Sequence, residues 1–293
     1  MAQAFYEASP AAKRVLDEAE AAHPGLLKLM WEGPKEDLTL TANQQPALVA
    51  AGAAAYAAYI EAGGKPASFG AGHSLGEYSA HVAAGSLGVG AAVKLVHLRG
   101  SYMQEAVPEG EGAMAAVLKL DDAQIAAVLA DVNKAASPGE LVQVANLNAP
   151  GQTVISGSQA AVARASELFK GLGGRAIPLA VSAPFHCDLM APAAARLAGD
   201  LAAAAFGNPA FTIVCNVTAE PLTDVSQAPR LLTEQVTSSV RWVESVRRLA
   251  FLGAERFIEF GSGEVLAGLV RRILPDVETI SVQDPASLAE ALA

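Results

Sequence analysis

A serine lies between two glycines in the spacing G-x-S-x-G. The stretch "GHSLGEYSA" (72–80) places Ser74 between Gly72 and Gly76. This spacing predicts a nucleophile on a sharp turn from a strand to a helix, because such a turn strains the serine backbone and leaves no room for flanking side chains. At the start of that helix, the backbone N–H of Leu75 would face an oxyanion with help from the helix dipole. The spacing therefore predicts acyl-transfer chemistry.

The same glycines could instead cradle a phosphate. A dinucleotide fingerprint needs G-x-G-x-x-G and an acidic residue about 20 positions later. Counted from Gly70, the sixth position is Leu75, and no Asp or Glu lies between Glu77 and Glu105. The sequence therefore favours a serine nucleophile over a nucleotide loop.

A serine nucleophile needs a base, and the chain offers five histidines. His23, His81 and His97 fall within predicted helices, where a structural role is expected. His73 adjoins the serine and is expected to line the pocket. His186, in the stretch "SAPFHCDLM", follows a predicted strand and lies in a loop that starts a helix. By elimination, His186 is predicted to be the general base.

The elements that must position these residues follow an α/β pattern. Helical segments alternate with short β-branched runs, which predicts a largely parallel sheet. A helix is expected over 41–64, a short buried strand ending at Ser74, and a helix over 75–85. Further core strands are expected within 211–222 and 255–261. Strand–turn–helix is the setting that a nucleophilic serine requires.

A second unit interrupts this pattern. From residue 112 the expected order is strand, helix, strand, strand, helix, strand, which matches a ferredoxin-like unit. We predict a large, discontinuous α/β-hydrolase-like catalytic domain with a parallel sheet over 1–111 and 182–293. The inserted ferredoxin-like subdomain covers 112–181, with elements at 113–118, 121–131, 141–146, 152–156, 158–171 and 174–181.

Length and composition set limits on function. The chain has 293 residues, 52% hydrophobic and 17% charged, as expected for an ordered protein of about two structural units. A net charge of −10 without a basic stripe argues against nucleic-acid binding. The least polar window, 46–60, is too short and alanine-rich to span a membrane, and no secretory leader is expected. Cys187, read as a packing residue, and Cys215 form no disulfide framework, so a cytoplasmic protein is expected.

Several motifs occur together in one order: "GHSLGEYSA", "LRGSYMQ" (98–104), "NLNAPGQTVISG" (146–157), "APFH" (183–186) and "SSVRWVESV" (238–246). Together they resemble the malonyl-CoA:acyl carrier protein transacylases, the FabD-like acyltransferase family. The resemblance runs from about residue 5 to the C-terminus and includes "FIEFGSGEVLAGLVRRI" (257–273). It implies a ping-pong transfer of malonyl from malonyl-CoA, through a Ser74 ester, to the phosphopantetheine thiol of acyl carrier protein, in fatty-acid or polyketide synthesis.

The resemblance also implies roles for individual residues. Arg99 matches the family arginine that grips the free carboxylate of the malonyl group, and guanidinium suits a carboxylate because it binds in a bidentate manner. The family has no acid partner for its histidine, and a backbone carbonyl matching Val240–Arg241 is expected to orient the His186 ring. The expected pocket-lining residues are Gln45, His73, Met103, Met114, Asn146, Asn148 and Phe185. Leu75 and Phe185 match the family members that select malonyl over methylmalonyl.

One family feature is absent from the sequence. Members begin with a strand and a G-Q-G-S-Q loop, whose glutamine N–H is the second oxyanion donor, whereas "MAQAFYEASP" (1–10) matches the helix after that loop. A start site set too late, a rearranged N-terminus and an impaired enzyme would each account for this. The first is favoured because every other catalytic position is kept.

Two alternatives of other classes stay open. A serine esterase or thioesterase of the α/β-hydrolase type would need an acid that pairs with His186. A carrier-protein-binding homologue would have lost activity with its N-terminus. For the transacylase, no bound cofactor or metal is expected, and the chain is expected to be a monomer. Because acyl carrier proteins are acidic, a locally basic docking surface is expected, with candidates Arg164, Lys170, Arg175, Arg271 and Arg272.

Overall fold

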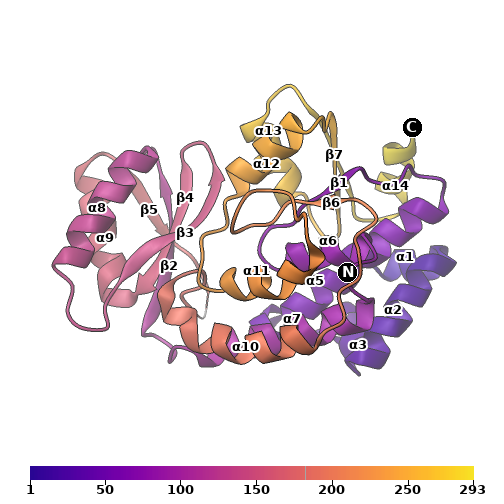
Figure 1. Ribbon diagram of the computed structural model, residues 1–293, viewed down its shortest axis with the longest axis horizontal. Coiled ribbons are helices and arrows are strands. Elements are labelled where there is room, and N and C mark those ends of the chain that lie inside the picture. Colours follow the sequence, from indigo (N-terminus) through magenta and orange to yellow (C-terminus); the bar gives the residue numbers. More distant parts are fainter. Residues whose placement is uncertain (182) are drawn as a thin grey trace.

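The computed structural model describes residues 1–181 and 183–293. Ser182, where the second segment of the predicted large domain begins, lies outside the described residues. Two lobes are visible, a larger one rich in helices and a smaller one built around a four-stranded sheet (Figure 1). The helices are α1 (Gln3–Ala8), α2 (Pro10–Ala22), α3 (Leu26–Glu32), α4 (Lys35–Thr39), α5 (Thr41–Glu61), α6 (Gly76–Ala83), α7 (Val89–Glu105), α8 (Asp122–Lys134), α9 (Gln159–Gly171), α10 (Ala191–Ala203), α11 (Ala228–Glu234), α12 (Trp242–Phe251), α13 (Val265–Ile273) and α14 (Pro285–Leu292), with 3₁₀ turns η1 (Asp188–Met190) and η2 (Val225–Gln227). The strands are β1 (Phe69–Gly70), β2 (Gly112–Leu118), β3 (Val142–Ala149), β4 (Gln152–Ser158), β5 (Arg175–Pro178), β6 (Thr212–Ile213), β7 (Arg256–Phe260) and β8 (Glu278–Val282).

Helix α5 lies at the centre of the larger lobe and packs against α2, α6 and α7. Most of its residues are buried, and the many alanines let the neighbouring helices approach closely. Helix α7 lies close to the start of α5 at Gly100, where an added Cβ would lie 2.6 Å from the carbonyl oxygen of Thr41. Position 100 therefore requires glycine, and the close approach sets the adjacent Arg99 against Gln45. None of the helices within the described residues is both long and apolar enough to cross a membrane.

Short parallel strands run through the larger lobe. Strand β1 pairs with β6, in the register Phe69↔Thr212 and Gly70↔Ile213, and β7 pairs with β8. In parallel strands the carboxyl ends meet at one edge, so the residues that follow β1 and β6 come together there. The predicted α/β class with parallel strands is confirmed. Strand β8 (Glu278–Val282) was not among the expected elements.

The smaller lobe has the predicted ferredoxin-like element order. Its antiparallel sheet has the strand order β3-β4-β2-β5, and α8 and α9 pack against it on the outer side (Figure 1). Its apolar core includes Ile125 of α8, Phe169 of α9 and Ile155 of β4. The observed elements start and end within a few residues of the expected ones, and β5 is the most shortened. The division into 1–111, 112–181 and 182–293 as domain boundaries stays a prediction.

Candidate active site

Ser74 lies on the turn between β1 and α6, with a left-handed φ of 53°. A Cβ on Gly72 would lie 1.9 Å from the carbonyl group of Gly76, so position 72 requires glycine. An added Cβ on Gly76 would meet nothing within 4 Å. The expectation that both glycines exclude a side chain is therefore wrong for Gly76, because the helix that starts there turns that position toward open space.

The backbone N–H groups of the turn differ in what they bind. The N–H of Ser74 donates to Oδ1 of Asn216 at 2.7 Å, and that of Gly76 donates to the carbonyl of His73 at 2.9 Å. The N–H of Leu75 has no acceptor within the described part of the chain. It lies at the start of α6, where the helix dipole favours negative charge. This N–H is free to receive an oxyanion.

His186 is the histidine that the fold brings to Ser74. Its Nε2 lies 2.8 Å from Ser74 Oγ, although 112 residues separate the two in the sequence. Its Nδ1 lies 2.9 Å from the backbone carbonyl of Gln235. Because a carbonyl only accepts, the proton of the neutral ring is on Nδ1 and Nε2 is free to accept from the serine hydroxyl. Burial, followed by the positive charge of Arg99, lowers the pKa of His186 to about 3, so the ring is neutral at pH 7.

The carbonyl that orients His186 is not the expected one. The carbonyl of Arg241 instead accepts from the backbone N–H and the hydroxyl of Ser245 in α12. The segment before α12 pairs with β3 through Val240, whose N–H and carbonyl bind Ala145 and Leu147. This pairing carries Arg241 into the first turn of α12 and away from the histidine. The expectation for Arg241 is therefore wrong. The backbone carbonyl of Gln235, directly after α11, binds the His186 ring instead.

Arg99 extends from α7 into the site and is 2% exposed. Its Nη1 donates to Oε1 of Gln45 at 2.7 Å. Its Nη2 donates to Ser74 Oγ at 2.9 Å and to Oε1 of Gln235 at 3.0 Å. Its buried Nε has no partner, and none of the ion pairs between described residues includes it. The site thus holds a buried cation beside Ser74 that no carboxylate of the described residues pairs with directly.

Four of the remaining predicted pocket residues form two groups. His73 Nε2 lies 2.7 Å from Oδ1 of Asn148, and burial lowers the pKa of His73. Met114 of β2 packs with Ala145 and Val154, and the half-buried Phe185 lies against this cluster.

Two further predicted residues are buried, and neither side chain has a hydrogen-bond partner among the described residues. Asn146 is buried, and its backbone forms a bridge with Val240. Met103 of α7 is buried in the core of the larger lobe.

Three buried polar residues of the site were not predicted. Gln235 contacts His186, Arg99 and the carbonyl of Ser74, and Asn216 binds the backbone on both sides of His73. Glu77, within the G-x-S-x-G stretch, accepts from both of them. The position of Glu77 beside the nucleophile was a local signal. Asn216 and Gln235 reach the site only through tertiary structure, and no local spacing marks them.

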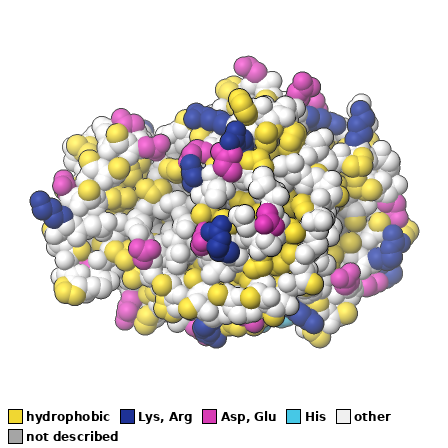
Figure 2. All heavy atoms as spheres, in the orientation of Figure 1, with side chains coloured by type: hydrophobic (Ala, Val, Ile, Leu, Met, Phe, Trp, Pro, Cys, Tyr) yellow, Lys and Arg dark blue, Asp and Glu magenta, His cyan; other side chains and the backbone are white. Residues whose placement is uncertain are grey.

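Charged side chains of both signs alternate on the face shown in Figure 2, without a large basic area. Of the candidate docking residues, Arg164 pairs with Glu140 and Arg271 donates to the hydroxyl of Thr279. Arg272 binds the turn between β3 and β4 through Gln152 and the carbonyl of Pro150. Lys170 and Arg175 lie at the end of α9 and the start of β5.

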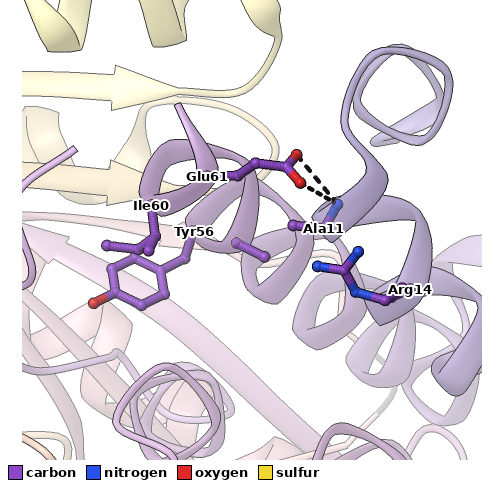
Figure 3. Close-up of a pocket in the computed structure, with 6 residues that line it drawn as sticks. Ala11, Arg14, Tyr56, Ile60 and Glu61 are labelled. Atoms are coloured by element: carbon purple, nitrogen blue, oxygen red, sulfur yellow. Dashed lines mark hydrogen bonds between the residues drawn. The ribbon is translucent and has the colours of Figure 1, made fainter. Parts of the chain in front are cut away.

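Two hollows lie away from this site. One, of about 450 Å³, lies between α2 and α5, where Glu61 accepts from the N–H of Ala11 and Arg14 and Tyr56 line the sides (Figure 3). The other, of about 400 Å³, lies between the lobes near Pro108. Neither is lined by Ser74, Arg99 or His186. Among the described residues, no group of three or more His, Cys, Asp or Glu side chains is arranged to hold a metal ion.

Known proteins resemble the whole chain. Residues 1–285 match the family described as "Acyl transferase domain". A malonyl CoA-acyl carrier protein transacylase of Bacillus subtilis is 47% identical, covering 100% of this chain and 92% of the relative. The protein of the same name from Escherichia coli is 43% identical, covering 97% of this chain and 91% of the relative. A solved complex of a type II PKS acyl-carrier protein with its malonyl-transacylase contains a chain with a TM-score of 0.94 and 42% identity, covering 100% of this chain and 94% of that one.

Proposed function

This chain belongs to the acyl transferase family, and from that membership we propose that it moves a malonyl group from malonyl-CoA to the phosphopantetheine thiol of acyl carrier protein. Its activity is that of a malonyl CoA-acyl carrier protein transacylase, in fatty-acid or polyketide synthesis. The proposal for the individual residues follows from the geometry around Ser74.

In the first half-reaction Ser74 Oγ attacks the thioester carbonyl of malonyl-CoA while His186 Nε2 takes its proton. The 2.8 Å contact between these atoms and the neutral imidazole support this step. The Leu75 N–H stabilises the negative charge that develops on the carbonyl oxygen. His186 then returns the proton to the CoA sulfur as the carbon–sulfur bond breaks, which leaves a malonyl ester on Ser74.

Arg99 determines the specificity for the acyl group. The free carboxylate of a malonyl group lies one methylene from the carbonyl that Ser74 attacks. A guanidinium nitrogen 2.9 Å from Ser74 Oγ, on a buried arginine with no paired carboxylate, suits an acyl group that brings its own negative charge. This contact is the single observation that best supports malonyl as the acyl group.

In the second half-reaction the phosphopantetheine thiol of acyl carrier protein attacks the Ser74 ester. His186 takes the thiol proton and gives it to Ser74 Oγ as the ester bond breaks, so the enzyme returns to its starting state. Neither half-reaction oxidises or reduces any group. The proposal therefore uses malonyl-CoA and the carrier thiol as substrates and no bound cofactor.

The pocket wall fits a small acyl group. Phe185 packs beside Met114, and we infer that its ring crowds an α-methyl substituent on malonyl. Such a difference in size is worth about 1–3 kcal/mol in selectivity. The expected preference is therefore for malonyl over methylmalonyl.

Two features weaken the alternative of a serine esterase with a Ser-His-acid triad. Nδ1 of His186 faces the carbonyl of Gln235 where a triad would place a carboxylate. Arg99 would also have no role in the hydrolysis of a neutral ester.

The proposal extends to the surroundings of the enzyme. Arg271 and Arg272 of α13 are proposed to meet an acidic carrier protein, and the enzyme is proposed to act as a monomer. A cytoplasmic location is proposed because both cysteines are free and buried, which suits a reducing compartment.

Intact-mass measurement after mixing with malonyl-CoA tests the proposal. We expect one malonyl group on the wild-type chain and none on Ser74→Ala. Later addition of phosphopantetheinylated carrier protein should discharge the ester. Stoichiometric labelling of Ser74→Ala would overturn the proposal.

A further inference from the structure

The backbone of Ser74 is held in an unfavourable conformation by a side chain far away in the sequence. Its φ of 53° lies in the left-handed region, which non-glycine residues adopt only when neighbouring contacts stabilise it. Asn216 supplies two such contacts. Its Oδ1 accepts from the Ser74 N–H at 2.7 Å, and its Nδ2 donates to the Gly72 carbonyl at 2.7 Å. One carboxamide therefore holds both ends of the segment that contains His73.

Asn216 itself is firmly fixed. It is 0% exposed and lies three residues after β6, whose pairing with β1 brings it to the turn. Its backbone N–H donates to Oε2 of Glu77 at 3.0 Å, and its carbonyl accepts from the N–H of Arg241 at 3.2 Å. Glu77, in the first turn of α6, is 1% exposed and also accepts from Gln235 Nε2 at 2.7 Å. The clamp, by which we mean the two hydrogen bonds of the Asn216 carboxamide to the Ser74 N–H and the Gly72 carbonyl, is thus fixed by Glu77 of α6, the helix that Ser74 precedes.

The other members of the site are positioned by a different residue. Gln235 accepts from Arg99 through Oε1 and from His186 through its backbone carbonyl. Asn216 contacts neither Arg99 nor the His186 ring through its carboxamide. Loss of the Asn216 carboxamide should therefore move Ser74 and leave the carboxylate-binding arginine and the base in place.

We propose that Asn216 is a positioning residue that holds Ser74 in its reactive conformation by binding the Ser74 N–H and the Gly72 carbonyl together. This inference rests on the proposed role of Ser74 as nucleophile. Without the clamp the turn relaxes, and Ser74 Oγ moves from Nε2 of His186 and from the position in which the Leu75 N–H meets the oxyanion.

Asn216→Ala removes both hydrogen bonds. A misplacement of about 1 Å lowers a rate on the order of 10²-fold, so acyl-enzyme formation at saturating malonyl-CoA should fall by that order. The half-saturating concentration of malonyl-CoA should change little, because Arg99 keeps its contacts with Gln45 and Gln235. Rapid-quench measurement of acyl-enzyme formation separates the two quantities.

Asn216→Asp gives a readout that a merely structural residue would not produce. An ionised aspartate still accepts from the Ser74 N–H but repels the Gly72 carbonyl, whereas a protonated one donates to that carbonyl again. The acylation rate of Asn216→Asp, divided by the wild-type rate at each pH, should therefore rise as pH falls. The titratable groups around the turn are Glu77, Tyr78, Cys215, His73 and His186, and the charged neighbours are Arg99 and Arg241. Both proteins share these groups, so division by the wild-type rate at each pH corrects for their common titration. The rate of Asn216→Ala, divided in the same way, should stay level.

Asn133 offers a matched control. Its carboxamide also makes two hydrogen bonds, to the N–H and the carbonyl of Val142, both at 2.8 Å, in the smaller lobe. Asn133→Ala and Asn133→Asp should leave the acylation rate per folded molecule and its pH dependence as in the wild type.

The outcomes separate the two ideas. Three results would overturn the inference. The rate of Asn216→Asp relative to wild type could stay level with pH, or it could only follow the folded fraction measured by circular dichroism. Asn216→Ala could also acylate at the wild-type rate. If Ser74→Ala takes up no malonyl label, the proposed function stands even when the inference about Asn216 fails. Label on Ser74→Ala would overturn the proposed function, and with it this inference.

Discussion

The backbone carbonyl of Gln235 accepts a hydrogen bond from Nδ1 of His186 at 2.9 Å, where many serine enzymes place a carboxylate. A carbonyl fixes the tautomer and the ring orientation but adds no negative charge. The buried Arg99 nearby adds a positive one, and together with burial it keeps the pKa of His186 low. This arrangement gives a base that is unprotonated over a wide range of pH.

The low pKa of His186 predicts an acylation rate that stays level from neutral to mildly acidic pH. Because the folded-state pKa is lowered from 6.5 to about 3, the free enzyme keeps Nε2 unprotonated and competent above that value. Rapid-quench rates of acyl-enzyme formation across this range provide the measurement. A decline centred near pH 6.5 would contradict the prediction.

The same lowered pKa predicts how stability depends on pH. The unfolded chain takes up a proton on His186 near its ordinary pKa and the folded chain does not, so the stabilising contribution is present above about 6.5 and is lost as pH falls toward about 3. Burial lowers the pKa of His81 to about 4, which acts in the same direction. Urea unfolding at a series of pH values should show that the free energy of unfolding falls less with decreasing pH in His186→Gln than in the wild type. An equal loss in both would count against the buried neutral imidazole.

Arg99→Ala should lower acylation by malonyl-CoA about 10- to 100-fold, as expected for the loss of a charge-assisted hydrogen bond. Acetyl-CoA carries no free carboxylate, so its acylation rate should fall much less and the preference for malonyl should shrink. Steady-state rates with both thioesters measure this ratio. Arg14→Ala, at the hollow between α2 and α5, is the control and should keep the wild-type preference. An unchanged malonyl-to-acetyl ratio in Arg99→Ala would refute the assigned role.

The two glycines beside Ser74 should respond differently to alanine. Gly72→Ala forces a Cβ into the carbonyl of Gly76 and should cost about 1–3 kcal/mol of folding free energy, as overpacking does, together with most of the activity. Gly76→Ala places its Cβ in open space and should be tolerated. Urea midpoints and acylation rates of the two variants test this contrast. Comparable losses in both would show that the second glycine has a steric role after all.

Arg271→Gln should raise the KM for acyl carrier protein several-fold, because a surface charge contributes about 1 kcal/mol or less to binding. The first half-reaction with malonyl-CoA should not change. Arg256→Gln, an exposed arginine of β7 that pairs with Glu278, serves as the matched control. The wild-type KM for the carrier should also rise with salt. A KM that is insensitive to both Arg271→Gln and salt would remove α13 from the docking surface.

The local features of the site could be read from the sequence because their physical causes are local. A strand, a strained serine and a helix follow one another within 69–83, and the steric demand at Gly72 arises from Gly76 four residues later. The ferredoxin-like unit was also readable, since each of its elements has its own apolar pattern and turn residues.

The distant features were decided by tertiary structure. The choice of Gln235 over Arg241 follows from the pairing of Val240 with β3, which no local pattern reveals. Asn216 reaches Ser74 only because β1 and β6 pair in a particular parallel register, across 142 residues of chain. The sequence by itself determined which groups are predicted to react, because that prediction depends on side-chain chemistry and local backbone strain. The fold decided which groups hold them, because buried hydrogen-bond partners are set by packing between segments far apart in the chain.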